Sequence, residues 1–122
     1  MFLTTLALAC ALADPQPAPS ADQPPEKPVF AIVFRTGPAW DAGKPPAEQA
    51  FFADHSKNLR ALREEGRLLL GGRFSDQGLV LVQAASQEEA QGFVDRDPSV
   101  KNGTFRAEVH RFAPFVAGCV GK

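Results

Sequence analysis

The stretch at residues 51–72 constrains the fold of this chain more than any other part of the sequence. It holds an amphipathic helix, which we expect over residues 47–65. Gly66 follows and can supply the left-handed residue that ends many helices. The apolar side of this helix carries His55 together with Phe51, Phe52, Leu59 and Leu62. A helix of this kind packs by its apolar side, so we expect His55 to be buried.

His55 is the only ionisable side chain in the middle of that apolar stripe, and two interpretations are open. Burial or a carboxylate partner can move the pKa of an imidazole, so that it exchanges protons near neutral pH. Alternatively, His55 is a core residue that is hydrogen-bonded to a backbone carbonyl. The helix alone does not separate the two.

Composition limits the class of protein. The chain has 122 residues, of which 44% are hydrophobic and 22% are charged, which is typical of one globular domain. Its formal net charge of -1 offers no basic field for nucleic acid, so we expect no nucleic-acid partner. Cys10 and Cys119 are the two cysteines, and no Cys/His cluster has the spacing of a metal site. We therefore expect neither a metal nor another cofactor.

Residues 1–13 contain no charge, are apolar apart from two threonines, and end in Ala11-Leu12-Ala13. This pattern predicts a signal peptide and a periplasmic or secreted protein. The run is too short for a membrane-spanning helix, which needs about 20 residues. Two alternatives are a lipid anchor at Cys10 and an apolar tail on a cytosolic protein.

Residues 14–28 include six prolines and no large apolar side chain. Such a segment buries too little surface to offset its ordering entropy, and proline favours extended geometry. We interpret it as a proline-rich linker that precedes a domain at residues 29–122.

The rest of the domain shows the hydrophobic patterns of four strands and a second helix. A capping box at Ser86 and Glu89 opens that helix, and Asp97-Pro98 ends it. Strands are expected at residues 29–35, 67–74, 78–85 and 104–116, with a four-residue turn at 75–78 and another turn at 101–103. His110 falls on the polar side of the last strand, where we expect it to be exposed.

The order β-α-β-β-α-β predicts an α+β, ferredoxin-like fold, in which a four-stranded antiparallel sheet carries two helices on one face. The first strand is apolar on both sides, and residues 68–70 are all leucine. The face of the sheet without helices therefore needs a cover as well. We expect a homodimer in which two sheets pack face to face.

The segments REEGRLLLGGRFSDQGLVLV, SQEEAQGFVDRDPSVKNG and FRAEVHRF, together with a histidine in the first helix, resemble the YciI-like, or YCII-related, domain family. The resemblance covers about residues 29–115. It implies a dimeric α+β barrel with a histidine and an aspartate in an active site, at positions that match His55 and Asp97. Many members of the family have Gly-Pro where this chain has Gly72-Arg73.

The chemistry of Asp97 supports a partnership with His55. We expect Asp97 at the C-terminal end of the second helix, where the helix dipole disfavours an anion. A nearby imidazole would explain a carboxylate in that place, although an aspartate before proline is also common in turns. Asp76, in the hairpin turn, is a second candidate acid or a turn former. Trp40, in the first loop, is either a flap over a pocket or an anchor at the core edge.

These residues predict a small exported enzyme that moves a proton on a small organic ligand. His55 would be the general acid and base, and Asp97 would orient it, as in cofactor-free isomerases or lyases. No serine or cysteine lies in a nucleophile motif, which disfavours a hydrolytic triad. The alternative is a non-catalytic ligand-binding or dimeric scaffold module of the cell envelope.

Overall fold

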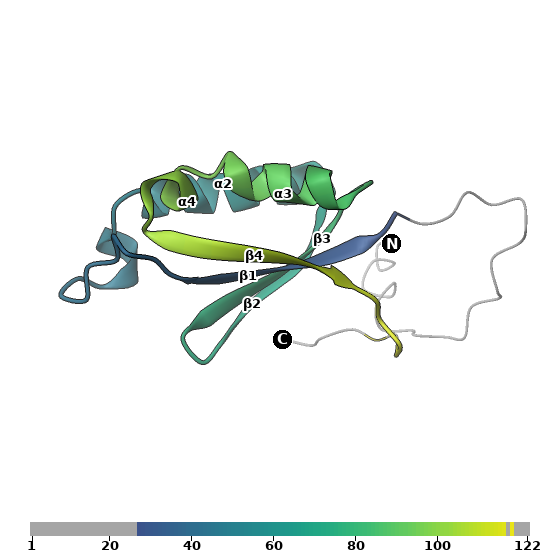
Figure 1. The fold of residues 1–122 in the computed structure, drawn as a ribbon, viewed down its shortest axis with the longest axis horizontal. Coiled ribbons are helices and arrows are strands. Elements are labelled where there is room, and N and C mark those ends of the chain that lie inside the picture. The colour runs from purple at the N-terminus through teal and green to yellow at the C-terminus, as the bar shows by residue number, and fades with distance from the viewer. Residues whose placement is uncertain (1–26, 117, 119–122) are drawn as a thin grey trace, which may run out of the picture. The chain divides into compact units, whose positions relative to one another are not determined.

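The described residues contain the four expected strands and the two expected helices in the expected order, together with a short helix that was not expected. The computed structural model describes residues 27–116 and 118, and Lys27–Ala113 form one unit within it. Its elements are β1 (Val29–Thr36), the 3-10 turn η2 (Pro46–Glu48), α2 (Phe52–Glu64), β2 (Leu68–Phe74), β3 (Gln77–Gln83), α3 (Gln87–Asp95), α4 (Pro98–Asn102) and β4 (Phe105–Phe112) (Figure 1). The strands pair antiparallel in the order β2-β3-β1-β4, so the ferredoxin-like expectation is confirmed.

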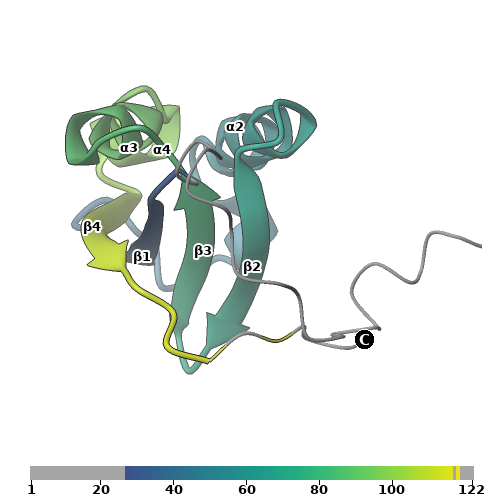
Figure 2. The ribbon, with the colours of Figure 1, turned by 90° about the vertical axis from the view of Figure 1, so that its right-hand side faces the viewer.

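Within residues 27–116, the helices α2, α3 and α4 all cover one face of the sheet. Figure 2 shows α2 above β2 and β3, while α3 and α4 lie above β1 and β4. The core fills the space between the two layers. It consists of Phe30, Ile32 and Phe34 from β1, Val80 and Val82 from β3, Ala84 just after it, Leu62 from α2, and Ala90, Phe93 and Val94 from α3. Alternate residues of the strands thus face the helices, as strand geometry requires.

Two helix-end signals in the sequence act as predicted. Gly66 follows α2 with a φ of 76°, and the Gly66 amide donates to the carbonyl of Arg63. Ser86 accepts a hydrogen bond from the Glu89 amide at 3.1 Å, and the Glu89 carboxylate reaches back to the Ala85 amide at 2.8 Å. These bonds satisfy backbone groups that the helices leave unpaired.

The expected start of the first helix is wrong. The continuous helix over residues 47–65 is divided into η2 and α2, because Phe51 adopts a left-handed φ of 63° between them. The buried side chain of Gln49 explains the interruption. Its amide donates to the carbonyls of Asp41 and Lys44, and its oxygen accepts from the Asp41 amide. Closing this loop holds the backbone out of the helical conformation, and tertiary contacts override helix propensity here.

Two turns also differ from expectation. The hairpin between β2 and β3 turns through Ser75 and Asp76 alone, where a four-residue turn was predicted. Residues 98–102, predicted to lie outside any helix, form α4, in which Pro98 occupies the first position. Proline is well suited to that position because its missing N–H has no partner in a first helical turn.

The face of the sheet opposite the helices is half apolar. Its residues alternate with the core residues of the same strands, and the apolar ones form what we call the open-face stripe: Ala31, Val33, Leu70, Phe74, Leu79 and Leu81. Leu70 is 40% exposed and Phe74 is 48% exposed. On the same face β4 presents Arg106, Glu108 and His110. The first strand is therefore not covered on both sides within one chain.

The predicted signal peptide, the Cys10 anchor, Cys119 and most of the proline-rich linker lie outside the described residues and stay predictions. Within the described residues, no helix is long and apolar enough to cross a membrane.

The end of β1 packs closely against the loop before β4, and a substitution at Gly37 tests this contact. Its amide donates to the Thr104 carbonyl at 2.8 Å, and a Cβ at residue 37 would collide with the Gly103 carbonyl oxygen. We expect Gly37→Ala to lower the free energy of unfolding by about 1–3 kcal/mol, measured by denaturant unfolding, because backbone must move to admit the methyl group. Gly72→Ala is the control, since nothing lies within 4 Å of its added Cβ. Equal stability of the two variants would contradict the packing described.

Candidate functional site

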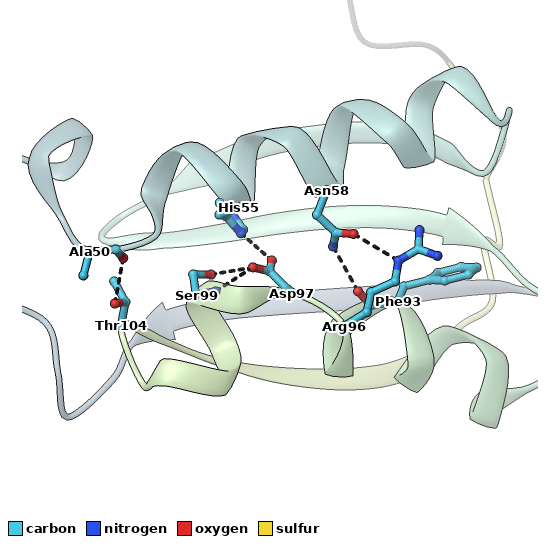
Figure 3. A network of polar contacts seen from close by, with 8 residues as sticks. All are labelled: Ala50, His55, Asn58, Phe93, Arg96, Asp97, Ser99 and Thr104. Atoms are coloured by element: carbon cyan, nitrogen blue, oxygen red, sulfur yellow. Dashed lines mark hydrogen bonds and ion pairs between the residues drawn. The ribbon is translucent and has the colours of Figure 1, made fainter.

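His55 lies in the second turn of α2 and is 8% exposed. Its Nδ1 is 2.7 Å from Oδ2 of Asp97, which comes from the junction between α3 and α4 (Figure 3). The sequence separates these residues by 42 positions, and the fold brings them into direct contact. The predicted pairing of the imidazole and the carboxylate is therefore present.

Asp97 is fully buried, and three donors surround it. Its Oδ1 accepts from the Ser99 amide at 2.9 Å and from the Ser99 hydroxyl at 2.8 Å, while Oδ2 faces His55 (Figure 3). Burial by itself raises the pKa of the Asp97 carboxyl, but the hydrogen bonds from His55 and Ser99 outweigh it and leave that pKa below its usual value. Asp97 is thus a carboxylate at neutral pH.

The expected place of Asp97 at the end of the second helix is confirmed, but the expected lack of local support for its carboxylate is wrong. Asp97 follows the end of α3, but it is the N-cap of α4, and its side chain accepts from the backbone of that helix. An N-cap favours a carboxylate, because the first amides of a helix have no partners within the helix. The carboxylate has local support as well as its imidazole partner.

This arrangement assigns the two nitrogens of the His55 ring. Because Asp97 is ionised and can only accept, Nδ1 carries the proton and donates to it. Nε2 is left as the nitrogen that can exchange a proton with another molecule. The ring packs edge-on to Phe34, with centroids 4.9 Å apart, and lies 4.8 Å from Phe105. Phe51, which was expected beside it, is instead 46% exposed.

A cavity of about 620 Å³ adjoins His55. Its size lies within the range of small-molecule sites, about 300–1,000 Å³. Aromatic residues from β1, α2, β4 and the first loop line it alongside His55, namely Phe34, Trp40, Phe52 and Phe105. Asp97 is not among the lining residues, so the carboxylate lies behind the imidazole and reaches the cavity only through it.

Two glycines help to create this hollow. Gly71 pairs with the buried Val80, and Gly78 pairs with the buried Phe34, so both positions face the helices. Neither has a side chain to fill the space between sheet and α2. A Cβ at Gly71 would meet its nearest neighbours at 3.8 Å and 3.9 Å, which is ordinary contact. The space is therefore open to a ligand and not closed by packing.

Trp40 and Asp76, the two further residues that the sequence suggested, line the cavity as well. Trp40 is half-buried, and its ring centroid lies 5.6 Å from that of Phe105. It therefore forms a wall of the cavity and also packs at the core edge. Gln49 holds the loop that carries Trp40, through the three hydrogen bonds described above. Asp76 is exposed in the hairpin turn at the other end of the cavity.

Polar contacts that the sequence did not point to fix α2 against the rest of the domain. Asn58 donates to the Phe93 carbonyl at 3.0 Å and accepts from Arg96 Nε at 3.0 Å (Figure 3). Thr104 is fully buried and donates to the Ala50 carbonyl at 2.9 Å. Only the bonds from Ser99 had a readable signal, since an aspartate before proline suits an N-cap that accepts from the residue after the proline. The others depend on long-range contacts.

His110 lies on the exposed side of β4, as predicted, with Nε2 3.1 Å from Glu108. It is far along the sheet from the cavity lining and does not contribute to it. Across residues 27–116, no three His, Cys, Asp or Glu side chains are grouped so that they could hold a metal ion.

The fold and the site define a ferredoxin-like α+β domain with a buried His–Asp pair beside an aromatic cavity. Residues 29–113 match the YCII-related domain, and the chain belongs to this family. No curated protein matches the chain. Among solved structures, it is similar to 5-chloro-2-hydroxyhydroquinone dehydrochlorinase (TftG) from Burkholderia phenoliruptrix AC1100 in complex with 2,5-dihydroxybenzoquinone. The identity is 22% and the TM-score is 0.50, over 69% of this chain and 93% of that one, which is a likeness of fold.

The lowered pKa of Asp97 predicts how stability depends on pH. A carboxyl whose pKa is lower in the folded than in the unfolded state stabilises the fold above its ordinary pKa. That contribution is lost as the pH falls through the folded-state value. We expect Asp97→Asn to lower the free energy of unfolding at pH 7 by about 1–3 kcal/mol, because an amide cannot replace the charge-assisted bonds. The gap should narrow below about pH 4.

Denaturant unfolding between pH 3 and pH 7 measures that gap. Asp95→Asn is the matched control, because it removes one exposed carboxylate from α3 without touching the pair. A gap between the wild type and Asp97→Asn that stays constant over the whole range would contradict the assignment.

Proposed function

We propose that this protein is a small-molecule enzyme that transfers a proton, with His55 as general acid and base and Asp97 as its positioning residue. One observation carries the proposal. The imidazole is held by a buried carboxylate through Nδ1, at 2.7 Å, and the same side chain lines the cavity. The carboxylate fixes the tautomer and orientation of the ring, as in other catalytic Asp–His pairs.

The proposed reaction starts with neutral His55. Nε2 accepts a proton from a C–H or O–H group of the ligand, and Asp97 stabilises the imidazolium that forms. The ligand then either takes the proton back at another atom, which is an isomerisation, or expels a leaving group, which is an elimination. In the isomerisation, His55 ends in its starting form. In the elimination, the proton leaves with the departing group or passes to water.

The surroundings of His55 support this chemistry. The aromatic walls formed by Phe34, Phe52 and Phe105 limit the access of water to the ring, and interactions between charges are stronger when water is excluded. The dehydrochlorinase that shares the fold is named for an elimination on a ring compound. This likeness agrees with an elimination here but does not define the substrate of this chain.

The alternative function is a ligand-binding or dimeric scaffold module without catalysis. The open-face stripe favours an interaction role, because it exposes apolar side chains on the sheet face without helices. The two functions differ in what they require of Nε2. A binding module needs the cavity and the stripe, whereas an enzyme also needs the exchangeable proton.

Substitution of the pair tests the catalytic role. On a substrate found by screening small cyclic compounds, we expect His55→Gln to lower kcat/KM by about 10²–10⁴-fold, because the proton acceptor is lost. Asp97→Asn should lower kcat by at least about tenfold, because an amide no longer holds the His55 ring in the tautomer that has its proton on Nδ1. KM should change less. The measurement is steady-state kinetics over a range of pH. His110→Gln, at the exposed histidine, is the control, and full turnover in the His55 and Asp97 variants would refute the role.

We also propose that two copies pair through their open faces. Most apolar residues of that face lie on β2, β3 and β1, and its charged residues lie on β4 and at Arg35 at the end of β1. An apolar centre with a polar rim is the usual composition of a stable interface. A single chain leaves Leu70 and Phe74 of the edge strand β2 exposed on this face, which pairing would cover.

Leu81, in the middle of the stripe and paired with Ala31, tests this dimer. Light scattering after gel filtration should give the mass of two chains for the wild type. It should give one chain for Leu81→Lys, because a charge at the centre of an apolar interface is left unpaired. Far-UV circular dichroism checks that the variant folds. His110→Gln changes the β4 side of the same face and should stay dimeric, and a monomeric wild type would exclude the interface.

A further inference from the structure

Arg73 is a cation at the cavity for which the described residues provide no partner. It lies on β2 beside Gly78, on the helix-facing side, and its side chain lines the cavity. The residue is exposed, and no hydrogen bond or ion pair with another described residue engages its guanidinium. An arginine without a partner beside an aromatic hollow is available to a ligand.

The other ionisable groups that line the cavity differ from Arg73. Arg35 donates to Glu108 at 2.7 Å and to Gln77 at 3.2 Å, so its charge is already paired with a carboxylate of the same chain. His55 is held by Asp97. Asp76 lines the same end of the cavity as Arg73 but does not form an ion pair with it. Arg73 is thus the group best placed to attract an anion, and Asp76 opposes it.

The cavity walls favour a flat ring. Four aromatic side chains contribute to them, and their faces and edges suit a planar cyclic compound: Phe34, Trp40, Phe52 and Phe105. Gly71 and Gly78 keep the floor of the cavity free of side chains. A ring between these walls lies beside the His55 ring, while a substituent on it can reach the hairpin.

We infer that the cavity takes a planar cyclic carboxylate, whose ring lies against the aromatic walls and whose carboxylate is bound by Arg73. This inference rests on the proposed function, because it assumes that the cavity is the substrate site. The planar guanidinium presents paired donors that match the two oxygens of a carboxylate. Arg73 is then the specificity-determining residue, and it fixes which atom of the ring meets His55.

Binding of 2-naphthoate and 2-naphthamide to the full chain tests the inference, because the two probes share a ring and differ in charge. We expect isothermal titration calorimetry to show that the wild type binds the carboxylate at least about tenfold more tightly than the amide. Arg73→Gln should remove that preference and leave amide binding unchanged. Asp76→Asn should increase the preference, because it removes the opposing charge.

Two further variants locate the effect. Arg60→Gln removes the same charge from the exposed outer side of α2 and should keep the preference of the wild type. Gly71→Val places a side chain in the hollow, at a position with ordinary contacts and no strained φ. It should weaken binding of both probes while the protein stays folded. Undiminished binding to Gly71→Val would place the probes outside the cavity and overturn the inference.

Two outcomes with the wild type and Arg73→Gln also overturn it: no carboxylate preference in the wild type, including the absence of naphthoate binding, or a preference that survives Arg73→Gln. These binding results are independent of turnover. If His55→Gln kept full activity while Arg73→Gln lost the preference, the catalytic proposal would fail and the anion site would stand. The reverse pattern would leave the catalytic proposal and remove the anion site.

Discussion

The hydrogen bond between His55 and Asp97 joins the two helical sides of the domain at a point that water does not reach. A buried carboxylate without donors would cost several kcal/mol, which is a large part of the stability of a domain. Here Ser99 and His55 supply three donors, and both come from elements whose positions must be correct at the same time. The α2 helix and the α3–α4 junction therefore hold each other in place, and the site is formed by the same bonds.

The sheet below these helices divides its inner face between packing and a cavity. One row of paired residues crosses from Val80 through Ile32 to Val109 and contributes to the core. On β2, the residue in this row is Gly71, which pairs with Val80. The next inward-facing pair on the hairpin is Arg73 and Gly78, where no apolar side chain fills the space. The hollow thus follows from residue choice at three positions on one hairpin. The pairing of β2 with β3 is regular from Leu70 to Phe74, after a register shift between Leu68 and Leu70.

Much of this fold can be predicted from local signals, because those signals have local causes. Alternation along β4, the glycine after α2 and the Ser86 capping box depend on nearby residues, and the structure has all three. The start of α2 could not be predicted, since Gln49 breaks the helix through contacts with the loop before it. The partner of His55 was suggested by a family resemblance and not by spacing. The three donors around Asp97 depend on α4, and the sequence pattern of residues 98–102 did not predict this helix.

The β2-β3 hairpin carries both surfaces on which the proposals depend. Strand geometry places most of their residues on opposite faces, and Leu79 contributes to both. Successive side chains point to opposite faces, so Arg73 faces the cavity and its neighbour Phe74 belongs to the open-face stripe. A change at Gly71 or Arg73 therefore acts on the ligand side, and a change at Leu81 acts on the opposite side. Because the two sets alternate, loss of ligand binding and loss of pairing can be produced one at a time in the same hairpin. If a variant on the ligand side and a variant at Leu81 each lost both ligand binding and pairing, the cause would have to be disruption of the hairpin itself. Its edge strand β2 is the least buried of the four strands.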